Sequence, residues 1–189
     1  KNNGLIINND KKIIITGYIF DASPLLKSLY KTNEKKMLSK KFSREVKVNL
    51  DKTITGTDDD ILSFSMIASI KKGAYDKLIL KGNFSDDEIV EISIYKQNNG
   101  DKTLQVVSDR ARPFVKSFDF IEGFEGGKLE YESVITEKFS NSNLLISNFK
   151  VSKVPALAKL LTLASFQGIA DTLSGEGIRF ESFEMKTNA

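Results

Sequence analysis

The sequence predicts a mainly β protein: an antiparallel meander of strands, with a long apolar helix near the C-terminus and one or two short helices. Three observations support this fold class. Most of the chain alternates apolar and polar residues with a period of two, which is typical of strands that bury one face. Turn-forming residues interrupt these runs at short intervals. One stretch, 155–173, is instead apolar on nearly all sides, as in a helix that is covered by other parts of the protein.

The predicted strands extend from the first part of the chain almost to its end. The first covers about 12–20, the meander occupies 45–151, and a last strand covers 178–186. Within the meander, alternation is clearest at 42–50, 62–70, 78–84, 90–94, 104–106, 129–135 and 144–151. Asn99-Gly100 between two such runs is the strongest hairpin signal. Further turns are predicted at 57–60, 72–73, 85–87 and 141–143, and short strands joined by tight turns favour antiparallel pairing.

The predicted helices interrupt this pattern. Ser23-Pro24 begins a short helix, because serine caps helices and proline suits their first turn; strand and helix together occupy 12–30. A second short helix is predicted at 112–118. The long helix begins at Pro155 and ends near residue 173, where Gly175 provides a C-terminal cap. Residues 31–44 form a basic linker between the first helix and the meander.

The composition removes several kinds of chemistry. The 189 residues include His 0, Cys 0 and Trp 0, which excludes a thiol nucleophile, a disulfide, a Cys/His zinc site and a Ser-His-Asp triad. We therefore predict a protein that is not an enzyme, with no catalytic residues, no metal and no cofactor. The 28 basic and 25 acidic residues nearly cancel, so no nucleic-acid partner is expected.

No apolar run is long enough to predict a membrane-spanning helix. The chain begins at Lys1 without an initiator Met or a signal-peptide pattern. We expect residues 1–189 to be a single segment of a longer protein, with any targeting signal outside it.

Several motifs have both a functional and a structural interpretation, and we favour the structural one for each. The acidic clusters 58–60 and 86–88 lack calcium-loop spacing and are expected to be solvated turns. Gly126-Gly127-Lys128 is not followed by Ser or Thr, so a turn is expected rather than a phosphate loop. Gly175-Glu176-Gly177 follows a helix rather than preceding one, and is also read as a turn. The basic linker either contacts anionic headgroups or is simply solvated.

Each predicted strand has one apolar face that needs a cover. A second sheet or the long helix would make a closed core, whereas a lipid chain would make the same faces a binding surface. Alternation alone leaves both arrangements open, and a closed core is the commoner one.

Three groups of segments resemble a known family. Residues 144–151, followed by Val154–Phe166 and then by 173–180, have the sequence LLISNFKV, VPALAKLLTLASF and LSGEGIRF. This order resembles the C-terminal region of AsmA-like envelope proteins of the YhdP type. Residues 17–26 and the pair Ser108-Asp109 with 126–129 are similar to further family segments, and the likeness covers about 12–183. Arg110–Pro113 departs from the family pattern.

This resemblance implies a fold and a function. AsmA-like proteins are similar to bridge-like lipid transporters: a long, curved antiparallel sheet forms a β-taco-like groove with an apolar lining. The family implies a periplasmic location, within an inner-membrane-anchored protein of a Gram-negative bacterium. It also implies phospholipid transport from the inner to the outer membrane, in support of outer-membrane biogenesis. It brings no catalytic residues.

Alternation selects the apolar strand faces, and the resemblance implies that they contact acyl chains. The predicted lipid-binding residues are Val46, Val48, Leu62, Phe64, Met66, Leu78, Leu80, Val90, Ile92 and Ile94. The same residues would otherwise pack beneath the long helix as a dry core. The expected partners are phospholipids, the two membranes through other parts of the protein, and envelope proteins. A second hypothesis is an envelope assembly or scaffold module that binds protein partners through its sheet edges.

Overall fold

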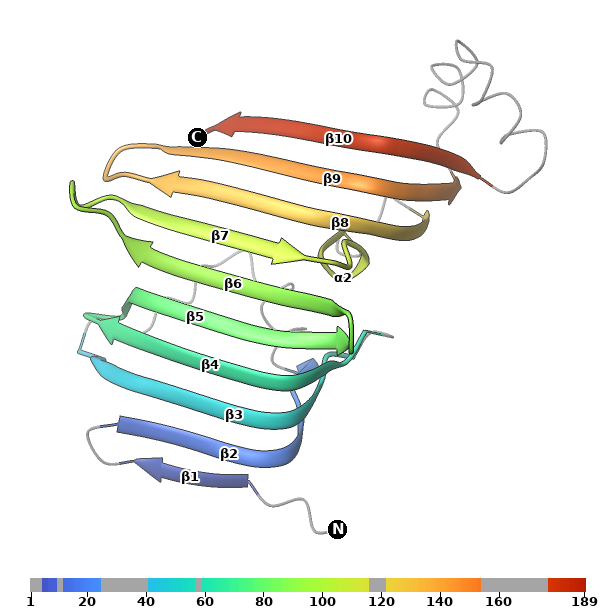
Figure 1. Ribbon diagram of the computed structural model, residues 1–189. Helices are drawn as coiled ribbons and strands as arrows, with labels where there is room; N and C mark the ends of the chain where they lie inside the picture. Colours follow the sequence, from blue (N-terminus) through green and yellow to red (C-terminus); the bar gives the residue numbers. More distant parts are fainter. Residues whose placement is uncertain (1–4, 10–11, 25–40, 57–58, 116–121, 154–176) are drawn as a thin grey trace.

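The computed structural model describes residues 5–9, 12–24, 41–56, 59–115, 122–153 and 177–189. These residues form one 10-stranded sheet in which the spatial order of the strands is their order in the chain. Figure 1 shows this sheet as a single curved layer, and the described residues contribute no second sheet. The prediction of a mainly β protein with a curved sheet is therefore confirmed.

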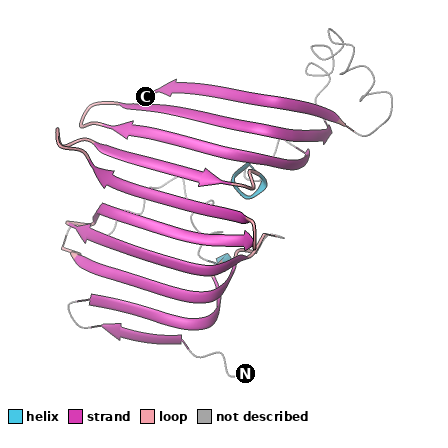
Figure 2. Ribbon diagram, in the orientation of Figure 1, coloured by secondary structure: helices cyan, strands magenta, loops and turns pink. Residues whose placement is uncertain are grey.

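The elements have the following bounds. The N-terminal half contains β1 (Leu5–Asn9), β2 (Lys12–Asp21), β3 (Arg44–Ile54), β4 (Ile61–Lys71) and β5 (Ala74–Ser85). The C-terminal half contains β6 (Glu88–Lys96), β7 (Lys102–Ser108), the short helix α2 (Arg112–Val115), β8 (Glu122–Ile135), β9 (Ser140–Lys153) and β10 (Ile178–Asn188). Figure 2 shows α2 beside the ends of β7 and β8. The strand β1 was not predicted.

The sheet is mixed, and the prediction of purely antiparallel pairing is wrong at one position. The strands β2 and β3 pair in parallel, from Lys12↔Glu45 to Asp21↔Ile54. Parallel neighbours require the chain to return to the same end of the sheet, which a tight turn cannot do. The sequence between β2 and β3 is 22–43, which includes most of the predicted basic linker. Residues 31–40 of that linker lie outside the described part, and Arg44 already belongs to β3.

Tight turns join several of the antiparallel pairs as predicted. Between β6 and β7, the Gly100 N–H donates to the Gln97 carbonyl at 3.0 Å, and Gly100 has φ +96°. Between β4 and β5, Lys72 and Gly73 have φ of +50° and +76°. Two consecutive positive φ values are the signature of the hairpin turn that best matches strand twist.

The predicted turn at 141–143 is wrong, because these residues pair within β9. The chain instead turns at 136–139, where the Thr136 N–H donates to the Phe139 carbonyl at 2.9 Å. The polar residue Ser142 is tolerated in the strand because its hydroxyl is bonded on both sides. It accepts from the Tyr131 hydroxyl at 3.1 Å and donates to the Ser133 hydroxyl at 2.9 Å.

Gly126 and Gly127 lie within β8, so the turn predicted there is also wrong. They have φ of +68° and +84°, which glycine adopts without steric cost. Gly127 is buried beneath α2: a Cβ atom added there would lie 3.0 Å from Phe149 Cβ and 3.2 Å from Ala111 Cβ. Glycine is thus required for both its conformation and its size.

The described residues test only part of the predicted helices. The helix predicted at 112–118 is confirmed at Arg112–Val115, and its remainder lies outside the described part. The long helix 155–173 lies outside it as well, as does the first predicted helix beyond Ser23 and Pro24. Within the described residues, no helix has the length and apolar character needed to cross a membrane.

We predict that Gly127→Ala lowers the free energy of unfolding by about 3 kcal/mol, through a strained backbone and crowding beneath α2. Gly100→Ala is the matched control. It also has positive φ, but its added Cβ would meet only Lys96 Cε at 4.0 Å, so a loss of about 1 kcal/mol is expected. Urea denaturation of both variants measures the difference. Equal losses would show that crowding at Gly127 contributes nothing.

Candidate functional site

A continuous row of apolar side chains crosses the sheet at right angles to the strands. Directly paired residues present their side chains on the same face, so the register defines this row. From β2 to β10 it consists of Ile15, Val48, Met66, Leu80, Ile92, Val106, Tyr131, Leu144 and Met185. At about 4.8 Å per strand, it extends for roughly 38 Å. We call the face that carries it the apolar face.

Parallel rows on either side widen this apolar face. One consists of Val46, Ala68, Leu78, Ile94 and Leu104, and it becomes polar at Ser133 and Ser142. The other includes Leu50, Phe64, Val90, Leu129, Ile146 and Phe183, and it is interrupted by Gly82 in β5 and by the buried Ser108 in β7. The apolar face is therefore a broad surface rather than a single line of contacts.

The apolar face is buried unevenly. Val48 and Val106 are buried, whereas Met66, Leu80 and Ile92 between them are half-buried. At the β10 edge, Met185 is 41% exposed. Much of the central row therefore retains accessible apolar surface.

Two residues in the left-handed backbone region shift the alternation near one end of the sheet. Ser63 in β4 has φ +49° and Asn148 in β9 has φ +55°. On the N-terminal side of Ser63, Ile61 rather than Leu62 shares a face with Val90. A Cβ atom added at Gly82 would contact the side chains of both Ile61 and Val90. Alternation from the buried Ile146 would next bury residues 148 and 150. After Asn148, however, the buried residues are Phe149 and Val151. A one-residue shift of this kind moves every subsequent side chain to the opposite face.

The structure places the predicted lipid-binding residues Val46, Val48, Phe64, Met66, Leu78, Leu80, Val90, Ile92 and Ile94 together on the apolar face. Leu62 is the exception: it pairs with Lys52 and is 38% exposed, while Ile61 takes its place. The lipid-binding residues predicted from the sequence did not include Val106, Tyr131, Leu144 and Met185, which continue the row. The same alternation was present in those strands and would have identified them.

An aromatic stack and α2 cover one end of the apolar face. The rings of Phe124 and Phe149 stack with centroids 5.1 Å apart, and Phe149 and Phe180 stack at 5.0 Å. Ala111 and Val115, at the helix, are fully or almost fully buried in the same cluster. This end of the sheet is a closed core.

A buried carboxylate holds the connections at this end together. Asp59, just before β4, is only 2% exposed. Its Oδ1 accepts from Arg110 Nη1 at 3.0 Å, and its Oδ2 accepts from Arg112 Nε at 3.0 Å. The expectation of a solvated acidic turn is therefore wrong for Asp59, because two distant arginines draw it into the interior.

Arg110 connects this carboxylate to a second one. Its guanidinium donates to Glu88 Oε2 through Nε at 2.9 Å and through Nη2, and its Cζ lies 5.3 Å from the centroid of the Phe84 ring. The Arg110 hydrogen bonds, with one from the Ser85 hydroxyl, lower the pKa of Glu88, and the same pairing raises the pKa of Arg110. The network ties the segment before β4 to the start of β6 and to the β7–α2 connection.

A second ion pair, between Asp109 and Lys128, lies nearer the surface. Asp109 accepts from the Ile89 backbone N–H at 3.0 Å and from Lys128 Nζ at 2.7 Å. These two bonds lower the pKa of Asp109, and the bond to Asp109 raises the pKa of Lys128. Within the described part of the chain, however, no acidic group gathers with others into a possible metal site. The charged residues here join strands and do not form a cation-binding cage.

Cross-strand polar pairs cover part of the opposite face, which we call the polar face. Lys81 Nζ donates to Glu91 Oε1 at 2.7 Å, and Gln105 Nε2 donates to Glu132 Oε2 at 2.7 Å. Exposed apolar residues such as Ile67 and Val107 also lie on this face, and Ile67 pairs directly with Ile79. The polar face is thus a solvated surface with engaged side chains, unlike the apolar face.

No family model matches this chain, and comparisons with curated proteins and with solved structures find no match.

We predict that Asp59→Asn lowers the free energy of unfolding by about 3 kcal/mol, because it leaves two arginines without their shared buried carboxylate. Asp60→Asn is the control: Asp60 pairs with Lys52 at 2.9 Å nearer the surface, and a loss below about 1 kcal/mol is expected. Denaturant unfolding at neutral pH measures both values. If Asp59→Asn costs no more than its neighbour, the buried pairing does not stabilise the fold.

The lowered pKa of Glu88 also predicts a pH dependence. A carboxyl group with a lower pKa in the folded state stabilises the fold above its unfolded pKa, and this contribution is lost as the pH falls through the folded pKa. Stability should therefore decrease between about pH 5 and pH 3. Glu88→Gln should make this decrease smaller, as measured by urea unfolding at a series of pH values. An unchanged decrease would mean that Glu88 does not contribute to it.

Proposed function

We propose that this chain is a non-enzymatic lipid-transfer segment that binds phospholipid acyl chains along its apolar face. The observation that carries this proposal is the uninterrupted row from Ile15 to Met185, much of which is only half-buried. A row of this kind in an ordinary core would be sealed along its whole length. Here the closed core is found at the end near α2.

The dimensions and chemistry of the row suit an acyl chain. The hydrocarbon core of a bilayer is about 30 Å thick and holds two leaflets, so one acyl chain spans roughly half of that. The row of roughly 38 Å is longer than one chain, which would allow a lipid to move along it without leaving apolar surroundings. Each CH₂ group kept out of water contributes about 0.8 kcal/mol. The only hydroxyl in the row, that of Tyr131, is bonded to Ser142.

The resemblance to AsmA-like proteins supports a specific setting for this activity. We propose that the segment acts in the periplasm, within an inner-membrane-anchored protein, and carries phospholipids from the inner to the outer membrane. Its sheet would form part of a longer groove of the β-taco type, and the membranes would be contacted by other parts of that protein.

The β10 edge favours a second candidate function, an envelope scaffold that pairs with other proteins. Among the described residues, no strand pairs with the outer edge of β10. Phe183 and Met185 on this strand are 46% and 41% exposed, so the apolar rows reach this edge without being covered. An unpaired edge with exposed apolar side chains is suited to strand addition by a partner.

We predict that the segment, expressed in a Gram-negative periplasm, co-purifies with phospholipid that native mass spectrometry and organic extraction detect. Ile92→Glu should abolish this binding, because it places a charge in the centre of the apolar row. Phe64→Glu, in the adjacent row, should reduce it. The bound lipid should be lost while circular dichroism still shows a folded sheet.

Ser93→Glu is the matched control for Ile92→Glu. It adds the same charge to the next residue of β6, which lies on the polar face and pairs with Ile79 and Gln105. This variant should retain lipid. Loss of lipid from both variants, or a folded wild-type protein without lipid, would contradict the proposed acyl-chain site and favour the scaffold function. If Ile92→Glu unfolds while Ser93→Glu does not, Ile92 belongs to a dry core.

A further inference from the structure

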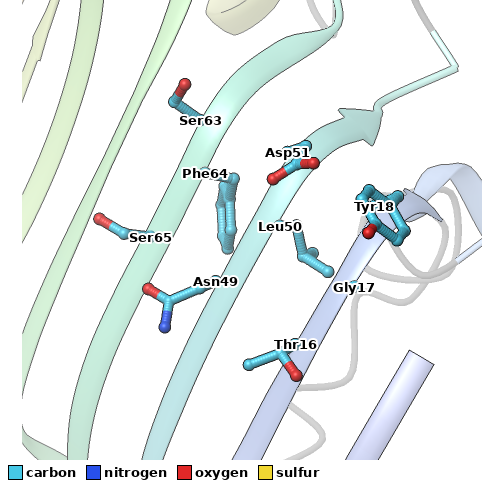
Figure 3. Close-up of a pocket in the computed structure, with 9 residues that line it drawn as sticks. All are labelled: Thr16, Gly17, Tyr18, Asn49, Leu50, Asp51, Ser63, Phe64 and Ser65. Atoms are coloured by element: carbon cyan, nitrogen blue, oxygen red, sulfur yellow. The ribbon is translucent and has the colours of Figure 1, made fainter. Parts of the chain in front are cut away.

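A hollow of about 530 Å³ lies over β2, β3 and β4. Figure 3 shows its lining, which takes consecutive residues from each of the three strands: Thr16, Gly17, Tyr18, Asn49, Leu50, Asp51, Ser63, Phe64 and Ser65. Thr16, Asn49 and Ser65 are paired in register, in the row of the polar face that continues to Lys81 and Glu91. The lining also includes Leu50 and Phe64, which belong to an outer row of the apolar face, so the hollow adjoins that face but does not include the central row.

The polar side chains in this hollow are not engaged with the rest of the protein. Within the described part of the chain, the hydroxyl, amide and carboxylate groups that line it make no hydrogen bond or ion pair. Farther along the same row, Lys81 and Glu91 are bonded to each other. The hollow thus gathers hydrogen-bonding groups that are available to a ligand.

One of the lining residues is also held in an unfavourable backbone conformation. Ser63 has φ +49°, which is sparsely populated by residues other than glycine, asparagine and aspartate. Conformations of this kind are concentrated at ligand-binding sites. The same residue lies at the register shift between Leu62 and Ser65 in the β4–β5 pairing, and such irregularities are common next to functional sites.

The chemistry of the lining selects among ligand classes. It contains no lysine or arginine, so nothing in it would balance the charge of a phosphate or carboxylate ligand. Asn49 and the serine and threonine hydroxyls both donate and accept, and Asp51 accepts only. Tyr18 is 53% exposed, and its ring offers a flat, electron-rich face. A neutral ring that carries many hydroxyls on its edge and C–H groups on its face matches this combination.

We propose that the hollow binds a neutral saccharide, either free or as the headgroup of a glycolipid. The sugar ring stacks its C–H groups on Tyr18, its hydroxyls donate to Asp51, and the Asn49 amide and Ser65 hydroxyl bond the remaining oxygens. The volume lies within the range of small-molecule sites, and its open, shallow form suits one or two sugar units. This site does not depend on the proposed lipid-transfer function.

The test is saturation-transfer NMR of the wild-type chain with methyl glucoside, methyl galactoside and N-acetylglucosamine. Glucuronate and choline are included as charged comparison ligands. We expect transfer to the ring C–H protons of at least one neutral sugar, with a dissociation constant in the millimolar range. Absence of transfer from every neutral sugar, both free and on vesicles, would overturn the proposal. Transfer to choline or glucuronate alone would overturn it too.

Variants locate the binding. Tyr18→Ala and Asp51→Ala should each weaken it by about tenfold or more, because each removes a principal contact. Tyr95→Ala is the matched control, since Tyr95 is 40% exposed and lies on β6 outside the hollow. Equal weakening by all three variants, or by none, would contradict the assignment. Tyr18→Ala should leave phospholipid binding unchanged, which separates this result from the test of lipid transfer.

A final comparison separates the two sources of the sugar. Phosphatidylcholine vesicles with and without a glucosylated diacylglycerol are mixed with the chain and sedimented. Binding only to the glucosylated vesicles, lost in Tyr18→Ala, supports a glycolipid headgroup. Binding to the free methyl glycosides without a further gain on vesicles supports a free saccharide. Equal sedimentation with both vesicle types, without transfer from any free sugar, would overturn the site.

Discussion

Backbone register is the constraint on which the other features of this molecule depend. The strands pair in chain order across the sheet, and each pairing keeps one apolar residue opposite another. Because side chains alternate with a period of two, a slip of one residue in any strand would turn its apolar set toward the polar face. The continuous row from Ile15 to Met185 exists because each direct pair along it is in register, and the register shifts of the β4–β5 and β5–β6 pairings lie to either side of it, at 62–65, 69–70 and 83–85.

The charged network near α2 supports this register from outside the strands. Asp59, Arg110 and Glu88 come from segments that precede β4, follow β7 and begin β6. A single sheet has little else to hold distant connections together, since its core is thin. The two arginines share one carboxylate that is almost completely buried, and removal of that carboxylate would take away the partner that joins them. The network therefore resists displacement of the start of β4 and the start of β6 relative to the end of β7.

The two faces of the sheet have opposite chemical characters, and each suits a different ligand. The apolar face offers a long surface without hydrogen-bonding demands, which fits a hydrocarbon chain. The hollow over β2–β4 offers free hydroxyl, amide and carboxylate groups beside Tyr18, which fits a polyhydroxylated ring. The two proposed sites adjoin each other, because Leu50 and Phe64 line the hollow and also belong to an outer row of the apolar face.

The sequence by itself determined the strand class, most strand positions, the hairpins at Lys72-Gly73 and Asn99-Gly100, and nearly all of the apolar face. These features are local: alternation and turn chemistry act between residues that are close in the chain. Tertiary structure alone decided the parallel pairing of β2 and β3, the exchange of Leu62 for Ile61, and the burial of Asp59. Each depends on a partner far away in the sequence or on a backbone conformation that its residue does not normally prefer. Nothing near Asp59 indicates that Arg110 and Arg112, more than fifty residues later, will enclose it.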